Sequence, residues 1–149
     1  MIVSLRDWAK NGWLTEHKSS PQEIAELLRV ADRDLVDCQV SGLSSDWRLS
    51  IAYNAALKLG TAALAAEGYR ASREAHHYRI IQSLAFTIGA GKELVIQLDQ
   101  FRKKRNISDY ERAGMVSDLE ANEMIALAEK LRKHVLNWLH SNQPELLLK

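Results

Sequence analysis

A cationic run that continues into polar side chains is the part of this sequence best equipped for chemistry. The run is Arg102, Lys103, Lys104 and Arg105, and Asn106, Asp109 and Tyr110 follow it. Arg and Lys side chains bind phosphate groups, so a local patch of this kind suits a nucleic acid or a nucleotide. The candidate nucleic-acid-binding residues are therefore Arg102, Lys103, Lys104, Arg105 and Asp109.

Two structural interpretations of the same run stay open. The cations can complement the C-terminus of a helix on a solvated face, at about 0.3–1 kcal/mol each. Alternatively, Asn106 can cap that helix while Asp109 pairs with Arg105, which would tie the loop to the rest of the fold.

Three further polar residues are weaker candidates. Asn54 lies one helical turn from Lys58, and the two can equally form the exposed stripe of a buried helix. His76 and His77 are adjacent, so on a helix they point about 100° apart and are poorly placed to chelate one ion. We therefore predict neither a metal nor a cofactor.

The helix that must position these residues is expected over Ser45 to Tyr69. Trp47 and Tyr53 fall on its apolar sides, and its alanines allow neighbouring helices to approach closely. A helix that is apolar around most of its circumference is usually buried on several sides. We expect this one to be the central rod of the fold, with Leu57 and Leu64 in the core.

The rest of the chain predicts further helices and no strand. The expected helices cover residues 3–14, Ser20 to about Gly42, Arg73 to Ile88, Lys92 to Arg105 and Ser117 to His140, with an irregular loop over residues 106–116. Two starts carry capping signals, Ser20-Pro21 with Glu23, and Ser117 with Glu120. The expected fold is all-α: an up-and-down helical bundle of four principal helices plus one or two short ones, forming a single domain over residues 1–149.

Bulk composition excludes several other classes of protein. Hydrophobic residues make up 46% and charged residues 26%, which argues against disorder. The net charge of +1 gives no global attraction to nucleic acid. The lone Cys38 cannot form an internal disulfide, no signal-peptide core is visible, and no apolar run reaches the length of a membrane span. We expect a cytoplasmic protein that does not associate with membranes.

Four segments in order resemble the HEPN family (higher eukaryotes and prokaryotes nucleotide-binding domain). They are Ala52-Tyr53-Asn54-Ala55-Ala56, the Glu67-Gly68-Tyr69 turn, His76-His77, and Arg105-Asn106 with Asp109-Tyr110. The resemblance covers roughly residues 45–113. It implies a helical bundle that forms a homodimer, with the Arg-Asn segments of two chains meeting near a cleft that binds RNA or a nucleotide.

The resemblance also implies a metal-independent ribonuclease, often a toxin paired with a nucleotidyltransferase-type antitoxin. Arg105, Asn106 and Tyr110 then become the candidate catalytic residues. In the family a His completes the motif, but here Tyr110 follows Arg105 after four intervening residues. A Tyr with a reference pKa of about 10 is a poor base, so we expect binding with slow or no cleavage.

The rival interpretation belongs to a different class of function. The chain would be a catalytically inactive helical module for protein–protein interaction, and its Arg-Asn-Asp-Tyr segment would be architectural.

Overall fold

Six α-helices and a small two-stranded sheet make up the described part of the chain. The computed structural model describes residues 4–110 and 116–148, and only the backbone of residues 107–110. The elements are α1 (Leu5–Lys10), β1 (Leu14–Glu16), α2 (Pro21–Asp37), α3 (Ser45–Ala66), β2 (Tyr69–Ala71), α4 (His76–Ser83), α5 (Lys92–Tyr110), α6 (Asp118–Asn142) and the 3-10 turn η1 (Pro144–Leu146). The mostly-α bundle is confirmed.

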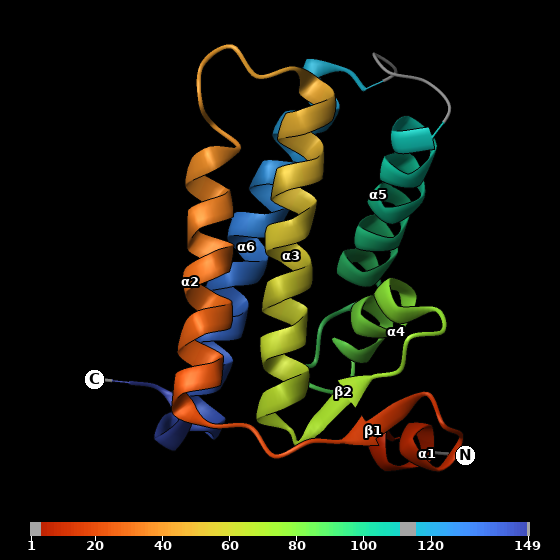
Figure 1. Ribbon diagram of the computed structural model, residues 1–149, viewed down its shortest axis with the longest axis vertical. Coiled ribbons are helices and arrows are strands. Elements are labelled where there is room, and N and C mark those ends of the chain that lie inside the picture. Colours follow the sequence, from red (N-terminus) through yellow and green to blue (C-terminus); the bar gives the residue numbers. More distant parts are fainter. Residues whose placement is uncertain (1–3, 111–115, 149) are drawn as a thin grey trace.

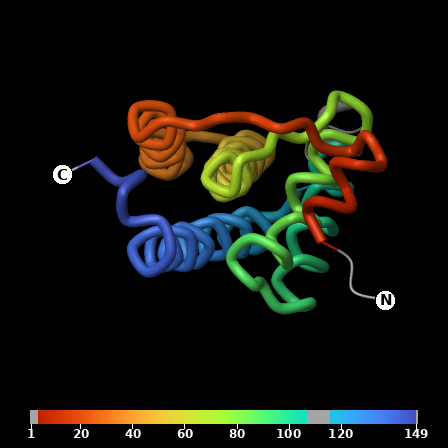
Figure 2. Tube along the Cα trace, turned by 90° about the horizontal axis from the view of Figure 1, so that it is seen from below, coloured from red at the N-terminus to blue at the C-terminus, as the bar shows by residue number. Residues whose placement is uncertain are grey.

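The four long helices α2, α3, α5 and α6 run up and down along the longest axis of the molecule (Figure 1). Helix α3 contacts α2, α4, α5, α6 and β2, so it is the central rod that its sequence predicts. Viewed along the helices, α2 and α3 form one layer and α6 lies beneath them (Figure 2). Helix α3 is also long and apolar enough to cross a membrane, but 72% of the relevant window is buried inside the fold, as expected for a core helix.

Local capping signals set the helix starts. The Ser20 hydroxyl accepts from the Glu23 amide at 3.2 Å, with Pro21 in the first turn. Ser117 and Glu120 form the expected reciprocal capping box. In α2 the Glu23 carboxylate instead binds Nε2 of His17 at 2.8 Å, which fixes the segment that leads into the helix.

The strand pair corrects the expectation that no strand would form. β1 and β2 are antiparallel, with Leu14 opposite Ala71 and Glu16 opposite Tyr69. Each strand has three residues, which is too short to give an alternating pattern in the sequence. Gly68, at a φ of 92°, turns the chain after α3 and brings the two segments together.

Other boundaries and faces also differ from expectation. Helix α4 ends at Ser83, and α5 continues to Tyr110 where an irregular loop was expected; residues 111–115 of that loop lie outside the described part. Trp47 is exposed, because it lies near the start of α3. The helical spacing of the Arg73 to Ile88 segment also predicts Tyr78 to face inward, but Tyr78 is exposed. Ile80 lies on the inner face of α4 and packs closely against Gly60 of α3. A Cβ added to Gly60 would lie only 2.7 Å from Cγ2 of Ile80, so this contact requires a glycine.

Candidate functional site

The start of α4 and the C-terminal half of α5 together form an open depression of about 500 Å³. Its lining residues are Ala75, His76, His77, Tyr78, Arg102 and Asn106. We call this feature the α4–α5 depression. It brings together four residues that the sequence singled out, namely His76, His77, Arg102 and Asn106. Two segments well separated in the chain therefore contribute to one surface.

His77 lies at the inner side of this depression. Its Nδ1 is 3.5 Å from the hydroxyl of Tyr53, and the two ring centroids are 5.9 Å apart. Burial lowers the pKa of His77, and the nearby positive charges of Arg105, His76, Arg102 and Lys58 lower it further. The imidazole is therefore mostly neutral at pH 7.

Tyr53 connects the site to the central helix. Its side chain is fully buried, and this burial raises the pKa of the phenol above its ordinary value, an effect that Arg105 and Arg102 partly offset. The guanidinium carbon of Arg105 lies 5.4 Å from the Tyr53 ring centroid, within the range of a cation–π contact. Arg105 is half-buried against α3 and does not line the depression.

His76 is the more exposed of the two histidines. Its Nδ1 lies 3.0 Å from the backbone carbonyl oxygen of Ser72. A carbonyl oxygen can only accept, so Nδ1 carries the proton and donates it. The ring centroids of His76 and His77 are 6.1 Å apart, so one small ligand can contact both rings.

Acidic partners divide the cationic run into separate ion pairs. Arg102 Nε lies 2.7 Å and Lys103 Nζ 3.6 Å from the Asp99 carboxylate. Lys104 Nζ lies 3.2 Å from Glu120 Oε2, which connects α5 to α6. The spacing of Asp99 three and four residues before Arg102 and Lys103 is the helical ion-pair signal that sequence reasoning missed.

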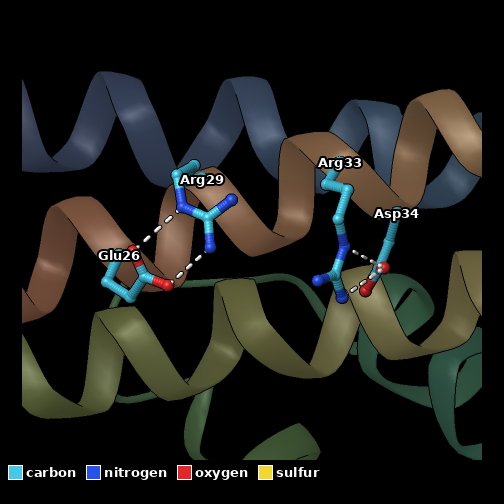
Figure 3. Close-up of polar contacts among 4 residues, drawn as sticks. All are labelled: Glu26, Arg29, Arg33 and Asp34. Atoms are coloured by element: carbon cyan, nitrogen blue, oxygen red, sulfur yellow. Dashed lines mark hydrogen bonds and ion pairs between the residues drawn. The ribbon is translucent and has the colours of Figure 1, made fainter.

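The arginines of α2 are paired in a comparable way. Arg29 contacts Glu26 through two nitrogens, at 2.9 and 2.6 Å, and Arg33 contacts Asp34 at 3.1 Å (Figure 3). Arg29 and Arg102 each have an acidic partner three residues earlier in the chain. Arg102 differs in its surroundings, because it lies beside two histidines and an aromatic ring.

The remaining candidates lie elsewhere. Lys103, Lys104 and Asn54 do not line the depression, and Asn54 is half-buried on α3. Asp109 and Tyr110 belong to the last turn of α5, but their side chains lie outside the described part. Among the described residues, no three His, Cys, Asp or Glu side chains are grouped closely enough to hold a metal ion.

Tyr78 and Ala75 are site residues that the sequence did not suggest. The guanidinium carbon of Arg102 lies 5.4 Å from the ring centroid of Tyr78, so a partly exposed aromatic face borders the depression. Ala75 has a φ of 53°, which is unusual for a residue with a Cβ, and it provides no side-chain cap to α4.

Comparison with models of known protein families finds no match to this chain, and comparison with curated proteins finds none either.

Proposed function

We propose that the chain binds RNA or a nucleotide at the α4–α5 depression. One observation carries the proposal: two histidines, an arginine and an asparagine from separate segments line a single depression, and none of its described lining residues is acidic. The Arg102 guanidinium and the Asn106 amide donate hydrogen bonds, and an imidazole does so through a protonated ring nitrogen, so this set of side chains is suited to an anion.

The chemistry of the lining assigns a role to each side chain. Arg102 can donate to a phosphate oxygen while its Nε stays on Asp99. The Tyr78 ring offers a stacking surface for a base, and stacking of this kind is worth about 1–3 kcal/mol per base. Asn106 supplies an amide that can both donate and accept, as contacts to a sugar or a base edge require.

The proposal extends to the HEPN family, on the four sequence segments given above. It carries with it a homodimer, a nucleotidyltransferase-type antitoxin as a partner, and a role in a toxin–antitoxin or defence module. Arg105 would then position Tyr53 through the cation–π contact and would not bind RNA directly.

A module for protein–protein interaction is the second candidate, favoured by exposed apolar side chains at one end of the bundle. They are Val36 in the last turn of α2, Val40 just after that helix, Trp47 at the start of α3 and Leu119 at the start of α6. The starts of α3 and α6 are joined there by a hydrogen bond between Ser45 and Asp118. On this alternative, the ion pair between Lys104 and Glu120 is architectural.

Fluorescence anisotropy with a labelled single-stranded oligoribonucleotide at low salt tests the first candidate. Arg102→Ala removes a charge-assisted hydrogen bond worth about 1.5–3 kcal/mol, so binding should weaken by roughly ten-fold or more. Arg29→Ala is the control, since it removes the same charge and an ion pair of the same sequence spacing from α2, at a more exposed position.

Asn106→Ala serves as a second variant, because Asn106 is exposed and its loss should not unfold the protein. Equal weakening by Arg102→Ala and Arg29→Ala would point to nonspecific attraction and contradict the site. Absence of binding at low salt in the folded wild-type protein would favour the interaction module.

A further inference from the structure

The distribution of charge on α5 limits how this chain can hold a nucleic acid. Asp99 engages Arg102 and Lys103, Glu120 engages Lys104, and Arg105 lies against the Tyr53 ring. A protein that follows a strand along its backbone needs several cations, each directed at its own phosphate. On α5 the four cations contact different partners, so they do not form a row that could follow successive phosphates.

The other guanidinium nitrogens of Arg102, the Asn106 amide and two imidazoles nevertheless lie together in one small region. His76, His77, Arg102 and Asn106 line a volume of about 500 Å³, which is in the range of a small-ligand site. The first turn of α4 adds to them, since its N-cap residue Ala75 supplies no side-chain hydrogen bond. A helix N-terminus alone would not define a site, but here it adds partial positive charge to a lining that is already rich in donors.

We propose that the α4–α5 depression binds a single phosphomonoester dianion, such as the terminal phosphate of a nucleotide or of an RNA end, and that His77 takes up a proton when this ligand binds. The inference rests on the proposed function and specifies its ligand: an end group, rather than an internal stretch of backbone.

The surroundings of His77 are the reason for the proton uptake. From α3 it faces the neutral Tyr53 and the cation Lys58, from its own helix His76, and from α5 Arg102 and Arg105. Asp99 of α5 is engaged with Arg102 and Lys103. Burial and the surrounding cations lower the pKa of His77.

A bound dianion reverses this balance. An opposite charge within about 4–6 Å favours the protonated imidazole and can raise its pKa by about 1–3 units. A phosphomonoester has a second pKa of about 6 and is mostly doubly charged at pH 7, whereas an internal phosphodiester carries one charge. The protonated His77 therefore attracts a terminal phosphate more strongly than it attracts an internal phosphodiester of the RNA backbone.

Isothermal titration calorimetry with defined ligands tests the ligand class. The probes are inorganic phosphate, a nucleoside 5′-monophosphate, the nucleoside itself, and one short oligoribonucleotide with and without its 5′-phosphate. We expect removal of the terminal phosphate to weaken binding ten-fold or more. The logarithmic salt slope should be about −0.7 to −1.4, as for one or two contacts, and not near −2.8 as for four.

The same titrations at pH 7, in two buffers with different ionisation enthalpies, count the protons. The nucleoside monophosphate should bind with net uptake of part of one proton, and His77→Gln should abolish that uptake. His140→Gln, an exposed histidine on α6, is the control and should leave it unchanged. Should His77→Gln unfold, the imidazole signals of wild-type His77 in NMR titrations with and without ligand provide the same readout.

The outcomes separate this inference from the proposed function. Equal affinity for the two oligoribonucleotides, with a slope near −2.8, would overturn end recognition while RNA binding stands. Failure of every probe to bind would remove the proposed function itself. Tight binding without proton uptake would refute the role of His77. Inorganic phosphate binding as tightly as the nucleotide would support a single-phosphate site and assign it to the free ion.

Discussion

The hydroxyl of Tyr53 lies 3.5 Å from Nδ1 of His77, and this contact joins the central helix α3 to the first turn of α4. The distance is at the outer limit for a hydrogen bond, so the bond itself is weak. The packing of the two rings, at 5.9 Å, and the full burial of Tyr53 do more to place His77.

Substitutions of Tyr53 should separate these two contributions. Tyr53→Phe keeps the ring and should lower the free energy of unfolding by less than about 1 kcal/mol, since a typical hydrogen bond contributes about 0.5–1.5. Tyr53→Ala leaves a cavity and should cost about 3–5 kcal/mol, as other aromatic-to-Ala changes do. Urea melts of both variants provide the measurement. A large loss of unfolding free energy in Tyr53→Phe would show that the hydroxyl stabilises the fold more than its 3.5 Å contact indicates.

Protonation of His77 should destabilise the fold when no ligand is added. Its pKa is lowered in the folded state, so below the unfolded value of about 6.5 the unfolded chain binds more protons. Stability should therefore rise as the pH rises towards about 6.5 and then level off. The slope stays below about 1.4 kcal/mol per pH unit because a single imidazole differs by at most one bound proton between the unfolded and folded states.

Urea melts of the wild type and His77→Gln between pH 5 and 8 give this contribution as a difference, which removes the effect of the other titrating groups. A difference that grows in the opposite direction, with His77 stabilising the fold at low pH, would mean that an acidic partner governs its charge.

Two leucines of α3 test how deeply each of its faces is buried. Leu64 is 1% exposed and packs with Leu5, Trp8 and Leu14, whereas Leu57 is only partly buried. Leu64→Ala should cost about 2–5 kcal/mol, and Leu57→Ala distinctly less, about 1. Denaturant melts of both variants, measured in parallel, compare the two losses of unfolding free energy. Equal losses would contradict the orientation of α3.

A homodimer should form in solution through the apolar end of the bundle. Val36, Trp47 and Leu119 are 70%, 63% and 67% exposed, and pairing across a two-fold axis is the commonest way to cover such residues. Sedimentation equilibrium at micromolar concentration should give a species of twice 16.9 kDa. Trp47→Ser should shift it towards the monomer.

Ile96→Ser is the matched control for this experiment, since Ile96 is 54% exposed on α5. Dissociation by Ile96→Ser instead would move the interface to α5. A wild-type protein that sediments only as a monomer would remove the dimer altogether.

The sequence by itself determined the features that depend on neighbouring residues. Ser20, Pro21 and Glu23 set the start of α2, and Ser117 with Glu120 the start of α6, because capping bonds span only three residues. The apolar spacing within α3 and α6 likewise predicted a helical bundle with α3 at its centre. Each of these signals lies within one or two turns of the chain.

Tertiary structure alone decided which polar residues share the site. Arg102 faces the depression while Arg105 lies on Tyr53, and His77 reaches the same surface from another helix. Adjacent cations in a run look alike in the sequence. Their directions are set by how α5 packs against α3 and α4 and, for Lys104, by Glu120 of α6. The β1–β2 pairing also depended on contacts between distant segments, which three-residue strands cannot signal locally.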